Sequence, residues 1–378
     1  MPVYTTGSST KTCWNICMEN KPRIIIAVTS DLSTDQRVLK VAGTFHRNGW
    51  EVLVIGRKLP DSKPLTTGFR HYRMRLMFRR GFQFYAEYNL RLFFFLLFKP
   101  VDTLYANDTD TLAGSYLASR IRRKKLIFDA HELFPEVPEL QHRPLVKRFW
   151  QRIEDRIIPH LKHSITVCES IAEYYRQRYG IHMQVVRNVP FSRNGIDNIA
   201  LKVPAGKKII LYQGALNTGR GLEWILNAMP LIDDAVLYII GDGDIRQKLQ
   251  QQTLALGITE KVIFHGKVAA EELHRYTASA HLGLCLLENR GLSYYYALPN
   301  RIFDYLHAGV PVLASPFPEI RKIVETYKTG ILIDKHDPVS LADSINNLLK
   351  NTYPTEHFKT IASEFCWEKE EAVLLKLI

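Results

Sequence analysis

Short apolar runs alternate with segments of helical periodicity along the first half of the chain. The first run, 23–29, has the length of a buried strand, and apolar residues at helical spacing predict a helix over 35–48. Ser33 and Thr34 are the candidate N-caps of that helix. The same pattern predicts later strands at 51–56, 102–107, 125–130, 163–168 and 184–187.

The second half repeats this alternation after a segment, 188–206, whose Pro, Gly and polar residues are typical of a linker. Strands that alternate with helices predict a parallel, doubly wound sheet in each half. Ligands bind beyond the carboxyl ends of such strands, so residues that directly follow a strand are the candidates for function. The predicted strands are 208–213, 235–240, 262–265, 282–287, 311–315 and 330–333, and the predicted helices are 222–231, 244–256, 271–279, 300–308, 320–327 and 341–349.

The segment 70–99 combines positive charge with large apolar side chains. It holds seven Lys or Arg residues and one Glu, so it carries half of the net charge of the chain. One interpretation is a core helix, 87–98, preceded by a solvated basic loop. The other is a surface that contacts anionic lipid headgroups or an acidic acceptor, which we favour for the loop 70–84. The residues expected to face the membrane are Arg73, Arg75, Arg79 and Arg80.

The composition narrows the class of partner. The 378 residues are 46% hydrophobic and 23% charged, which is typical of a globular protein, and the formal net charge is +12. Such a charge predicts an acidic partner, namely nucleic acid, anionic lipid or a phosphorylated small molecule. No nucleic-acid-binding motif accompanies the charge, so we expect no nucleic-acid partner.

The cysteines and the apolar runs bear on the cellular compartment. Five scattered cysteines favour a reducing compartment over a disulfide framework, and Cys13 and Cys17 have no further Cys or His nearby to complete a zinc site, so we expect no metal. The polar leader 1–20 lacks the apolar core of a signal peptide, and no apolar run is long enough to span a membrane. We therefore expect a cytoplasmic protein that is peripheral on the inner face of the cell membrane.

Three motifs that follow strands of the second half favour binding of a phosphorylated ligand. The turn 214–222 begins at Gly214 and carries Arg220, whose guanidinium suits phosphate. Gly241 opens a Gly-Asp-Gly turn that lacks the third glycine of a dinucleotide fingerprint. The predicted helix 300–308 places Asn300 and Arg301 at its N-terminus, where an anion would bind, and Asp304 on the same face, where a carboxylate could accept hydrogen bonds from a ribose.

Polar residues also follow the strands of the first half. His131 and Glu132 come directly after the strand 125–130 and are the candidate catalytic residues, although a lone histidine is more often structural. Asp108 and Asp110, in a segment that reads as a loop, follow the strand 102–107. Asp31, Asp35 and Arg37 follow the first strand and are expected on the acceptor side of the same site.

With these motifs in order, nearly the whole chain resembles the retaining nucleotide-sugar glycosyltransferases of family 4, which have the GT-B fold of two Rossmann-like domains facing a central cleft. The segments that carry the resemblance are 30–38, 128–132, 214–221, 241–243, 265–268 and 298–312. The resemblance implies that Arg220 holds the donor diphosphate and Asp304 the ribose. It also implies that the chain at Lys267 and Val268 runs beside the nucleobase, and that His131 reaches toward the transferred sugar.

Two departures from the family pattern concern the donor sugar. The first glutamate of the family's E-x7-E motif is replaced by Tyr296, and the second by Asp304. Glu288 is a candidate to contact the sugar hydroxyls instead of the missing glutamate. The arginine that often follows the glycine of the turn is replaced by Ala215.

The resemblance implies a domain organisation and a reaction. We expect a leader (1–20), an acceptor-side domain (21–192), a linker (193–206), a nucleotide-sugar domain (207–360) and a C-terminal helix (361–378) that crosses back. The expected activity is transfer of a sugar, with retention, from a nucleoside-diphosphate sugar to a glycan or lipid-linked acceptor in polysaccharide or glycolipid synthesis, with no cofactor besides the donor. A nucleotide-sugar epimerase of the same fold and a non-catalytic scaffold that binds membrane or acidic polymer are the alternatives.

Overall fold

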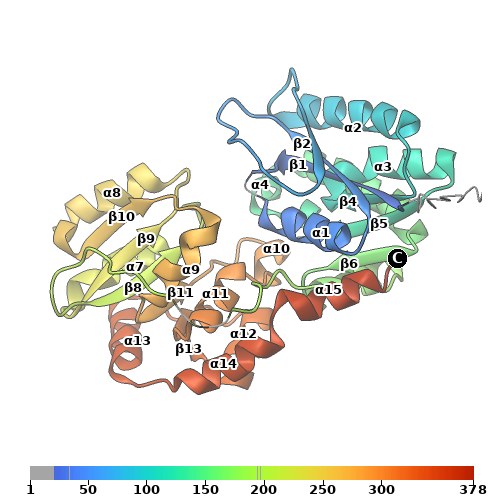
Figure 1. Cartoon of the computed structure of the whole chain (residues 1–378). Coiled ribbons are helices and arrows are strands. Elements are labelled where there is room, and N and C mark those ends of the chain that lie inside the picture. The colour runs from blue at the N-terminus through green and yellow to red at the C-terminus, as the bar shows by residue number, and fades with distance from the viewer. Residues whose placement is uncertain (1–20, 34, 194, 196) are drawn as a thin grey trace, which may run out of the picture.

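The computed structural model describes residues 21–378 except 34, 194 and 196. The predictions for the leader, for Cys13 and Cys17, and for Thr34 as an N-cap lie outside the described residues. Figure 1 shows two lobes side by side, each built around a sheet with helices on both faces. The predicted fold class, two Rossmann-like doubly wound domains, is confirmed.

The first sheet has the strand order β3-β2-β1-β4-β5-β6-β7, and every neighbouring pair is parallel. Its central strands are apolar and buried because helices cover both faces of the sheet. The strands are β1 (Arg23–Asp31), β2 (Glu51–Arg57), β3 (Arg70–Met74), β4 (Thr103–Asn107), β5 (Lys125–Ala130), β6 (His163–Thr166) and β7 (Gln184–Val185).

Helices cover the first sheet in two layers. One apolar core joins α1 and the C-terminal helix α15 to one face, and a second joins α2, α3 and α6 to the other. The N-cap of α1 is Asp35, whose carboxylate accepts from the amide of Val38, so Ser33 is not the cap. The helices are α1 (Gln36–Arg47), α2 (Gly81–Phe98), α3 (Asp108–Arg122), α4 (Pro138–Gln141), α5 (Pro144–Ile157) and α6 (Glu169–Tyr179), with short 3₁₀ turns η1 (Phe134–Glu136) and η2 (Ile158–His160).

The second sheet has the order β10-β9-β8-β11-β12-β13, again with parallel neighbours. Both orders are those of a Rossmann sheet, with the switch point beside the first strand of each half. The strands are β8 (Lys208–Gln213), β9 (Ala235–Ile240), β10 (Val262–Gly266), β11 (Leu282–Cys285), β12 (Val312–Ala314) and β13 (Gly330–Leu332).

The helices of the second half also form two layers, with α7, α8 and α13 on one face and α11, α12 and α14 on the other. The helix predicted over 300–308 is confirmed residue for residue. The helices are α7 (Leu222–Ala228), α8 (Arg246–Ala255), α9 (Ala270–Ala278), α10 (Leu292–Tyr295), α11 (Asn300–Ala308), α12 (Pro318–Tyr327), α13 (Pro338–Lys350), α14 (Thr355–Glu364) and α15 (Trp367–Leu375), with 3₁₀ turns η3 (Met229–Leu231) and η4 (Thr259–Lys261).

The helix α15 returns to the first domain and lies beside α1 (Figure 1). Trp367 at its start is wholly buried in the core of that domain, and its indole N–H donates to the hydroxyl of Thr44 over 2.9 Å. Its amide donates to the carbonyl of Pro190 in the segment between the sheets. The chain therefore ties its C-terminal end to both the first domain and the connecting segment.

The segment predicted as a basic loop, 70–84, is not one. Arg70–Met74 forms the edge strand β3, and α2 begins at Gly81, six residues before the predicted helix start. Arg73 therefore lies on a strand, and its guanidinium donates to the carbonyl of Lys63. Within the described residues, no helix combines the length and apolar character needed to cross a membrane.

Candidate active site

His131 lies just beyond the end of β5 and between two carboxylates. Its amide donates to Asp108, and its ring Nδ1 lies 3.3 Å from the same carboxylate. Its Nε2 lies 3.2 Å from Asp129 in an ion-pair contact that lacks hydrogen-bond geometry. Burial alone would lower the pKa of the ring, but Asp108 and Asp129 raise it to about 9. The imidazole is therefore held as a cation at neutral pH, which suits a donor of hydrogen bonds and not a nucleophile.

Arg37 was predicted to face an acceptor site. In the structure it instead forms a buried ion pair with Asp129, which also contacts His131. Its guanidinium donates two hydrogen bonds to Asp129, at 2.9 and 2.8 Å, and a third to the carbonyl of Val186. Tyr105 donates to the same carboxylate. Burial would raise the pKa of Asp129, but Arg37 and His131 hold it well below its usual range. Arg37 thus fixes the carboxylate that in turn holds His131.

Asp108 and Asp110 lie in the first turn of α3 and not in a loop. Asp108 adopts a left-handed backbone conformation, with φ of 56°, which is strained for a residue with a side chain. This conformation directs its carboxylate to both the amide and the ring of His131. Burial, together with the charge of Asp108, raises the pKa of Asp110 to about 8, and its carboxylate accepts from Thr29.

Glu132 touches the second domain. Its carboxylate lies 3.5 Å from the hydroxyl of Ser293 on α10. Burial, with the charges of Asp108 and Glu139, raises its pKa to about 7. The carboxyl edges of the two sheets therefore lie toward each other, and an acid that exchanges protons near neutral pH lies where they meet.

The buried acid Glu154 of α5 supports this site. Its carboxyl accepts from Thr109, beside Asp108, at 2.6 Å and from Tyr179 at 3.2 Å. Despite these hydrogen bonds, burial raises its pKa from 4.5 to about 7. The folded protein therefore keeps the Glu154 proton over a pH range in which the unfolded chain loses it.

We expect the Glu154→Gln variant to change how stability depends on pH. Between pH 5 and pH 7 the Glu154 carboxyl is more fully protonated in the folded wild type than in the unfolded chain, so rising pH lowers the stability by about 2 kcal/mol through this group. Glutamine removes that loss. Urea unfolding at both pH values should show that the free energy of unfolding of the variant rises relative to that of the wild type as pH rises. A difference in unfolding free energy that does not change with pH would contradict the assignment.

On the second domain, three glycine turns meet at the carboxyl edge of the sheet. The amide of Gly214 donates to the carbonyl of Ile240, and that of Gly241 to the carbonyl of Gly266. A Cβ on Gly241 would lie 1.9 Å from the carbonyl oxygen of Gly214, so no other residue can occupy this position. The two predicted donor-site glycines, Gly214 and Gly241, are thus neighbours.

Arg220 and Arg301 lie near these turns and carry N–H groups without partners. The guanidinium of Arg301 packs 4.6 Å from the centre of the Tyr212 ring and lies next to Gly214, and its Nη1 is buried with no hydrogen-bond partner. The guanidinium of Arg220 packs 4.7 Å from the ring of Tyr294, and its Nε is likewise unpaired. Stacking fixes both forks, and the unsatisfied donors suit an oxyanion such as phosphate.

Asp304 lies one turn after Arg301 on α11 and accepts from Gln213 at 2.8 Å. Burial raises its pKa to about 6, against the opposing effect of Lys40 from the first domain. A cavity of about 590 Å³, also lined by Arg193 and His274, adjoins this carboxylate. An acceptor of hydrogen bonds thus borders a space large enough for part of a ligand.

The remaining predicted donor-side residues lie at the same edge. Asn300 is the exposed first residue of α11, and Lys267 is exposed just after β10. Val268 packs partly buried against the core. The structure therefore gathers the predicted donor residues at the carboxyl ends of β8, β9 and β10.

Asp31 and Asp35 shape the loop after β1. Asp31 accepts from the amide of Ser33 and from the hydroxyl of Ser62. Asp35 accepts from Ser30 and caps α1. Both carboxylates hold backbone in place in this loop.

Two residues singled out for the altered E-x7-E motif have other contacts. Tyr296 packs against the core of the first domain, and its carbonyl accepts from the thiol of Cys168. The Glu288 carboxylate pairs with Arg290 over 2.6 Å, and the backbone amide of Glu288 donates to the carbonyl of Gly219 in the turn 214–222. Neither side chain is directed by these contacts to a sugar.

Sequence reasoning missed the partners of the predicted residues. Tyr212 and Tyr294 fix the two arginines, and Lys40 acts on Asp304 from the other domain. Of these three residues, only Lys40 could have been found from the sequence, since it lies near Arg37 on the predicted helix 35–48. In the part of the chain that the structure describes, no group of three or more His, Cys, Asp or Glu side chains could hold a metal ion.

Two Rossmann-like domains whose facing edges carry glycine turns, stacked arginines and a histidine held between two carboxylates have the GT-B fold. Residues 35–197 match the family described as "Glycosyltransferase Family 4", and residues 207–351 match "Glycosyl transferases group 1". The two matches together cover most of the chain. The chain belongs to glycosyltransferase family 4.

Individual relatives match over shorter stretches. An uncharacterized glycosyltransferase of Methanocaldococcus jannaschii is 28% identical over 173 residues, which are 45% of this chain and 43% of that protein. A phosphatidyl-myo-inositol mannosyltransferase of Mycobacterium leprae is 29% identical over 162 residues, 42% of this chain and 41% of that protein. The matched segment thus spans about two fifths of each curated relative. The sucrose-phosphate synthase of Thermosynechococcus elongatus superposes with a TM-score of 0.77 at 17% identity, over 94% of this chain and 98% of that one, and shows the fold.

Proposed function

We propose that the protein transfers a sugar from a nucleoside-diphosphate sugar to a glycan or lipid-linked acceptor, with retention of the anomeric configuration. The observation that carries the proposal is the pair of stacked arginines, Arg220 and Arg301, whose unpaired N–H groups lie beside the glycine turns. These groups would stabilise the charge that develops on the departing diphosphate. Asp304 would accept hydrogen bonds from the ribose.

In the proposed reaction, the bond from the anomeric carbon to the diphosphate oxygen breaks while a bond to the acceptor oxygen forms on the same face of the sugar. The acceptor proton passes to the departing diphosphate oxygen. His131, as an imidazolium between Asp108 and Asp129, would donate a hydrogen bond to a sugar hydroxyl and orient the ring. Glu132 would lie at the junction of the two domains, beside Ser293.

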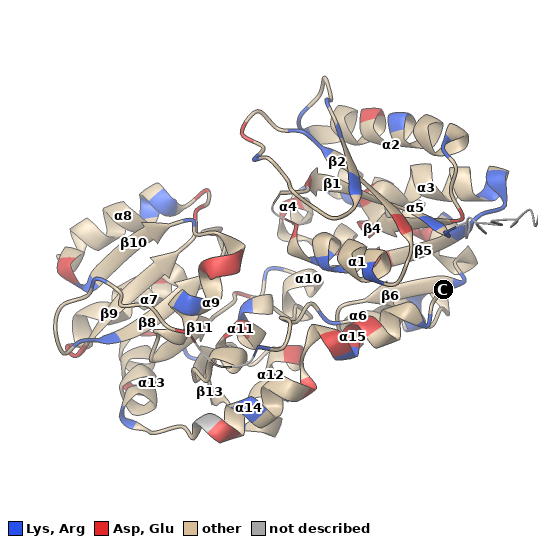
Figure 2. Ribbon diagram, viewed as in Figure 1, with Lys and Arg blue, Asp and Glu red and all other residues tan. Residues whose placement is uncertain are grey.

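The surface of the first domain supports an acceptor at an anionic membrane. Phe82, Leu90, Phe94 and Phe98 share one exposed face of α2, with exposed fractions of 51–82%. Lys and Arg residues, blue on the ribbon in Figure 2, lie on the loops next to this helix. Apolar rings beside cations suit the interface of an anionic bilayer. A role in glycolipid or cell-surface polysaccharide synthesis follows, and the relative that acts on phosphatidyl-myo-inositol supports it.

A ligand screen followed by a turnover assay tests the proposal. Nucleoside diphosphates and their sugars should raise the melting temperature, because a ligand that binds the folded state stabilises it by mass action. With the stabilising donor, release of nucleoside diphosphate should depend on added lipid or glycan acceptor. Conversion of the donor with no acceptor present would instead indicate an epimerase, and absence of any stabilising nucleotide would reject the transferase.

A further inference from the structure

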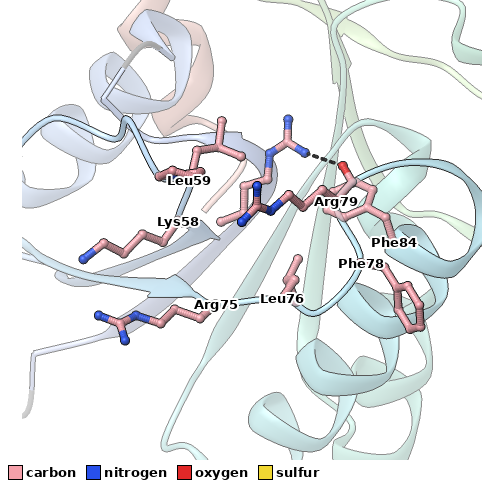
Figure 3. A pocket seen from close by; sticks show the side chains of 9 residues that line it. Lys58, Leu59, Arg75, Leu76, Phe78, Arg79 and Phe84 are labelled. Carbon is pink, nitrogen blue, oxygen red and sulfur yellow. Dashed lines mark hydrogen bonds between the residues drawn. The ribbon is translucent and has the colours of Figure 1, made fainter.

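A basic cavity of about 330 Å³ lies in the first domain at the carboxyl ends of β2 and β3 (Figure 3). Four cations line it, namely Arg57, Lys58, Arg75 and Arg79. Figure 3 shows Lys58 and Arg75 extending to the same side from the ends of the two strands, with Arg79 beside them. This cavity is separate from the two arginines of the donor side, which belong to the second domain.

The cations of the cavity are not paired with acidic side chains in the part of the chain that the structure describes. Within the described residues none of the four forms an ion pair, although neighbouring arginines do: Arg70 pairs with Glu51 and Arg91 with Glu87. Arg57 is held in place, because its guanidinium packs 4.9 Å from the ring of Phe84 and donates to the carbonyl of Arg79. The Nε of Arg57 is nevertheless buried with no partner. Gathering like charges in this way is unfavourable unless an anion joins them.

The rest of the lining is apolar. It consists of Leu59, Pro60, Leu76, Phe78 and Phe84, of which Phe78 has an exposed fraction of 39%. Arginine forks suit the oxygens of a phosphate ester, and the apolar groups suit a hydrocarbon chain attached to it. Inorganic phosphate alone would leave the apolar wall in contact with water.

Ring contacts and charge interactions link the cavity to the candidate active site. Arg57 is the register partner of Asp31 at the end of β1, so the cavity flanks the loop on the acceptor side. The ring of Phe84 packs against that of Tyr85, with 4.8 Å between the ring centres. The Tyr85 ring packs in turn against that of Phe134, 6.4 Å away, and Phe134 follows His131 by three residues in the chain. Burial raises the pKa of Tyr85 to about 12, and the charges of Asp110, Arg57 and Glu132 all act on it.

We propose that this cavity binds the phosphate or diphosphate group of a lipid-linked acceptor, with the first carbons of its chain against Leu76, Phe78 and Phe84. The inference rests on the proposed transferase function and names its acceptor class. Two of the four arginines predicted to meet a membrane, Arg75 and Arg79, would then hold one ligand and not a lipid surface in general. A phosphate fixed here would direct the sugar-accepting end of the molecule along Tyr85 toward His131.

Binding of soluble probes tests the cavity without turnover. Geranyl diphosphate and inorganic diphosphate would be titrated by calorimetry into the full chain. The Arg75→Gln/Arg79→Gln variant should bind geranyl diphosphate at least tenfold more weakly than the wild type. A variant that removes two exposed cations at the opposite end of the sheet, Arg120→Gln/Lys162→Gln, is the control and should bind as the wild type does. The same comparison in an Arg220→Ala background, in which the donor side holds a diphosphate less tightly, should show the same tenfold loss.

Each other outcome contradicts a stated part of the inference. Equal binding by the Arg75/Arg79 variant overturns the site, and equal affinity for the two probes overturns the lipid chain. If that variant loses only sedimentation with phosphatidylglycerol vesicles, as the Phe94→Ser/Phe98→Ser variant should, the residues serve a membrane surface and the cavity is not a site. A nucleotide that stabilises the protein while geranyl diphosphate does not bind would reject this inference alone and leave the transferase standing.

Discussion

Replacing Arg37 with alanine should lower the free energy of unfolding by about 3–5 kcal/mol, the cost of leaving one partner of a buried ion pair without the other. Both side chains are almost wholly buried, with exposed fractions of 3% for Arg37 and 0% for Asp129. Two hydrogen bonds join them, and a third ties the guanidinium to the carbonyl of Val186. Alanine would leave the Asp129 carboxylate buried beside Tyr105 and His131 with its main counter-charge gone.

Chemical denaturation of the variant and of a matched control measures this effect. Arg47→Ala removes an arginine from the same helix, but its pair with Glu371 is exposed, so we expect a loss of at most about 1 kcal/mol. Adding Asp129→Asn to Arg37→Ala should recover part of the lost stability, because the unpaired charge is then removed. Equal stability of the Arg37→Ala and Arg47→Ala variants would show that the buried pair does not stabilise the fold.

The same pair explains what the sequence could reveal about the first domain. Arg37 follows a strand and a polar loop, so its position alone predicts a residue that faces the ligand site. Its partner lies 92 residues away along the chain, and only the parallel neighbours β1, β4 and β5 bring the two together. Local spacing can therefore indicate the face of a helix, but not which distant carboxylate lies against it.

The fold itself was largely predictable because buried parallel strands are continuous apolar runs. The strand 125–130 and the helix 300–308 were predicted with their observed bounds. The strand β3 was not, since Arg70, His71 and Tyr72 are exposed on the edge of the sheet, where charged residues are common and no apolar run is required. The missed strand matters because its end forms one wall of the basic cavity.

The sequence predicted which residues lie on the donor side, but not how their side chains are held in place. Glycine turns and basic residues after strands were visible, and the structure gathers them at one edge. The tyrosines that fix the arginines carry no local signal, because Tyr294 is 74 residues from Arg220. Their contribution is rigidity: a stacked guanidinium loses less freedom when it binds phosphate than one that moves in solvent.

Arg220→Ala should therefore reduce kcat/KM by about 10- to 150-fold, which corresponds to the 1.5–3 kcal/mol of a hydrogen bond to a charged group. The variant keeps the fold, because the side chain contacts the Tyr294 ring and its Nε has no partner to lose. If the arginine stabilises the leaving diphosphate more than the bound donor, kcat will fall more than KM rises. Steady-state kinetics with the donor found by thermal shift would measure both constants.

A matched arginine and a charge-preserving change separate this role from a general loss of charge. Arg321→Ala removes an exposed arginine of the same domain that pairs with Glu325, and its kinetics should not change. Arg220→Lys keeps the charge but loses the planar fork that stacks on Tyr294, so it should recover only part of the lost rate. Full recovery by lysine would mean that charge alone is required at this position, and unchanged kinetics in Arg220→Ala would remove Arg220 from the donor site and leave Arg301 as its buried cation.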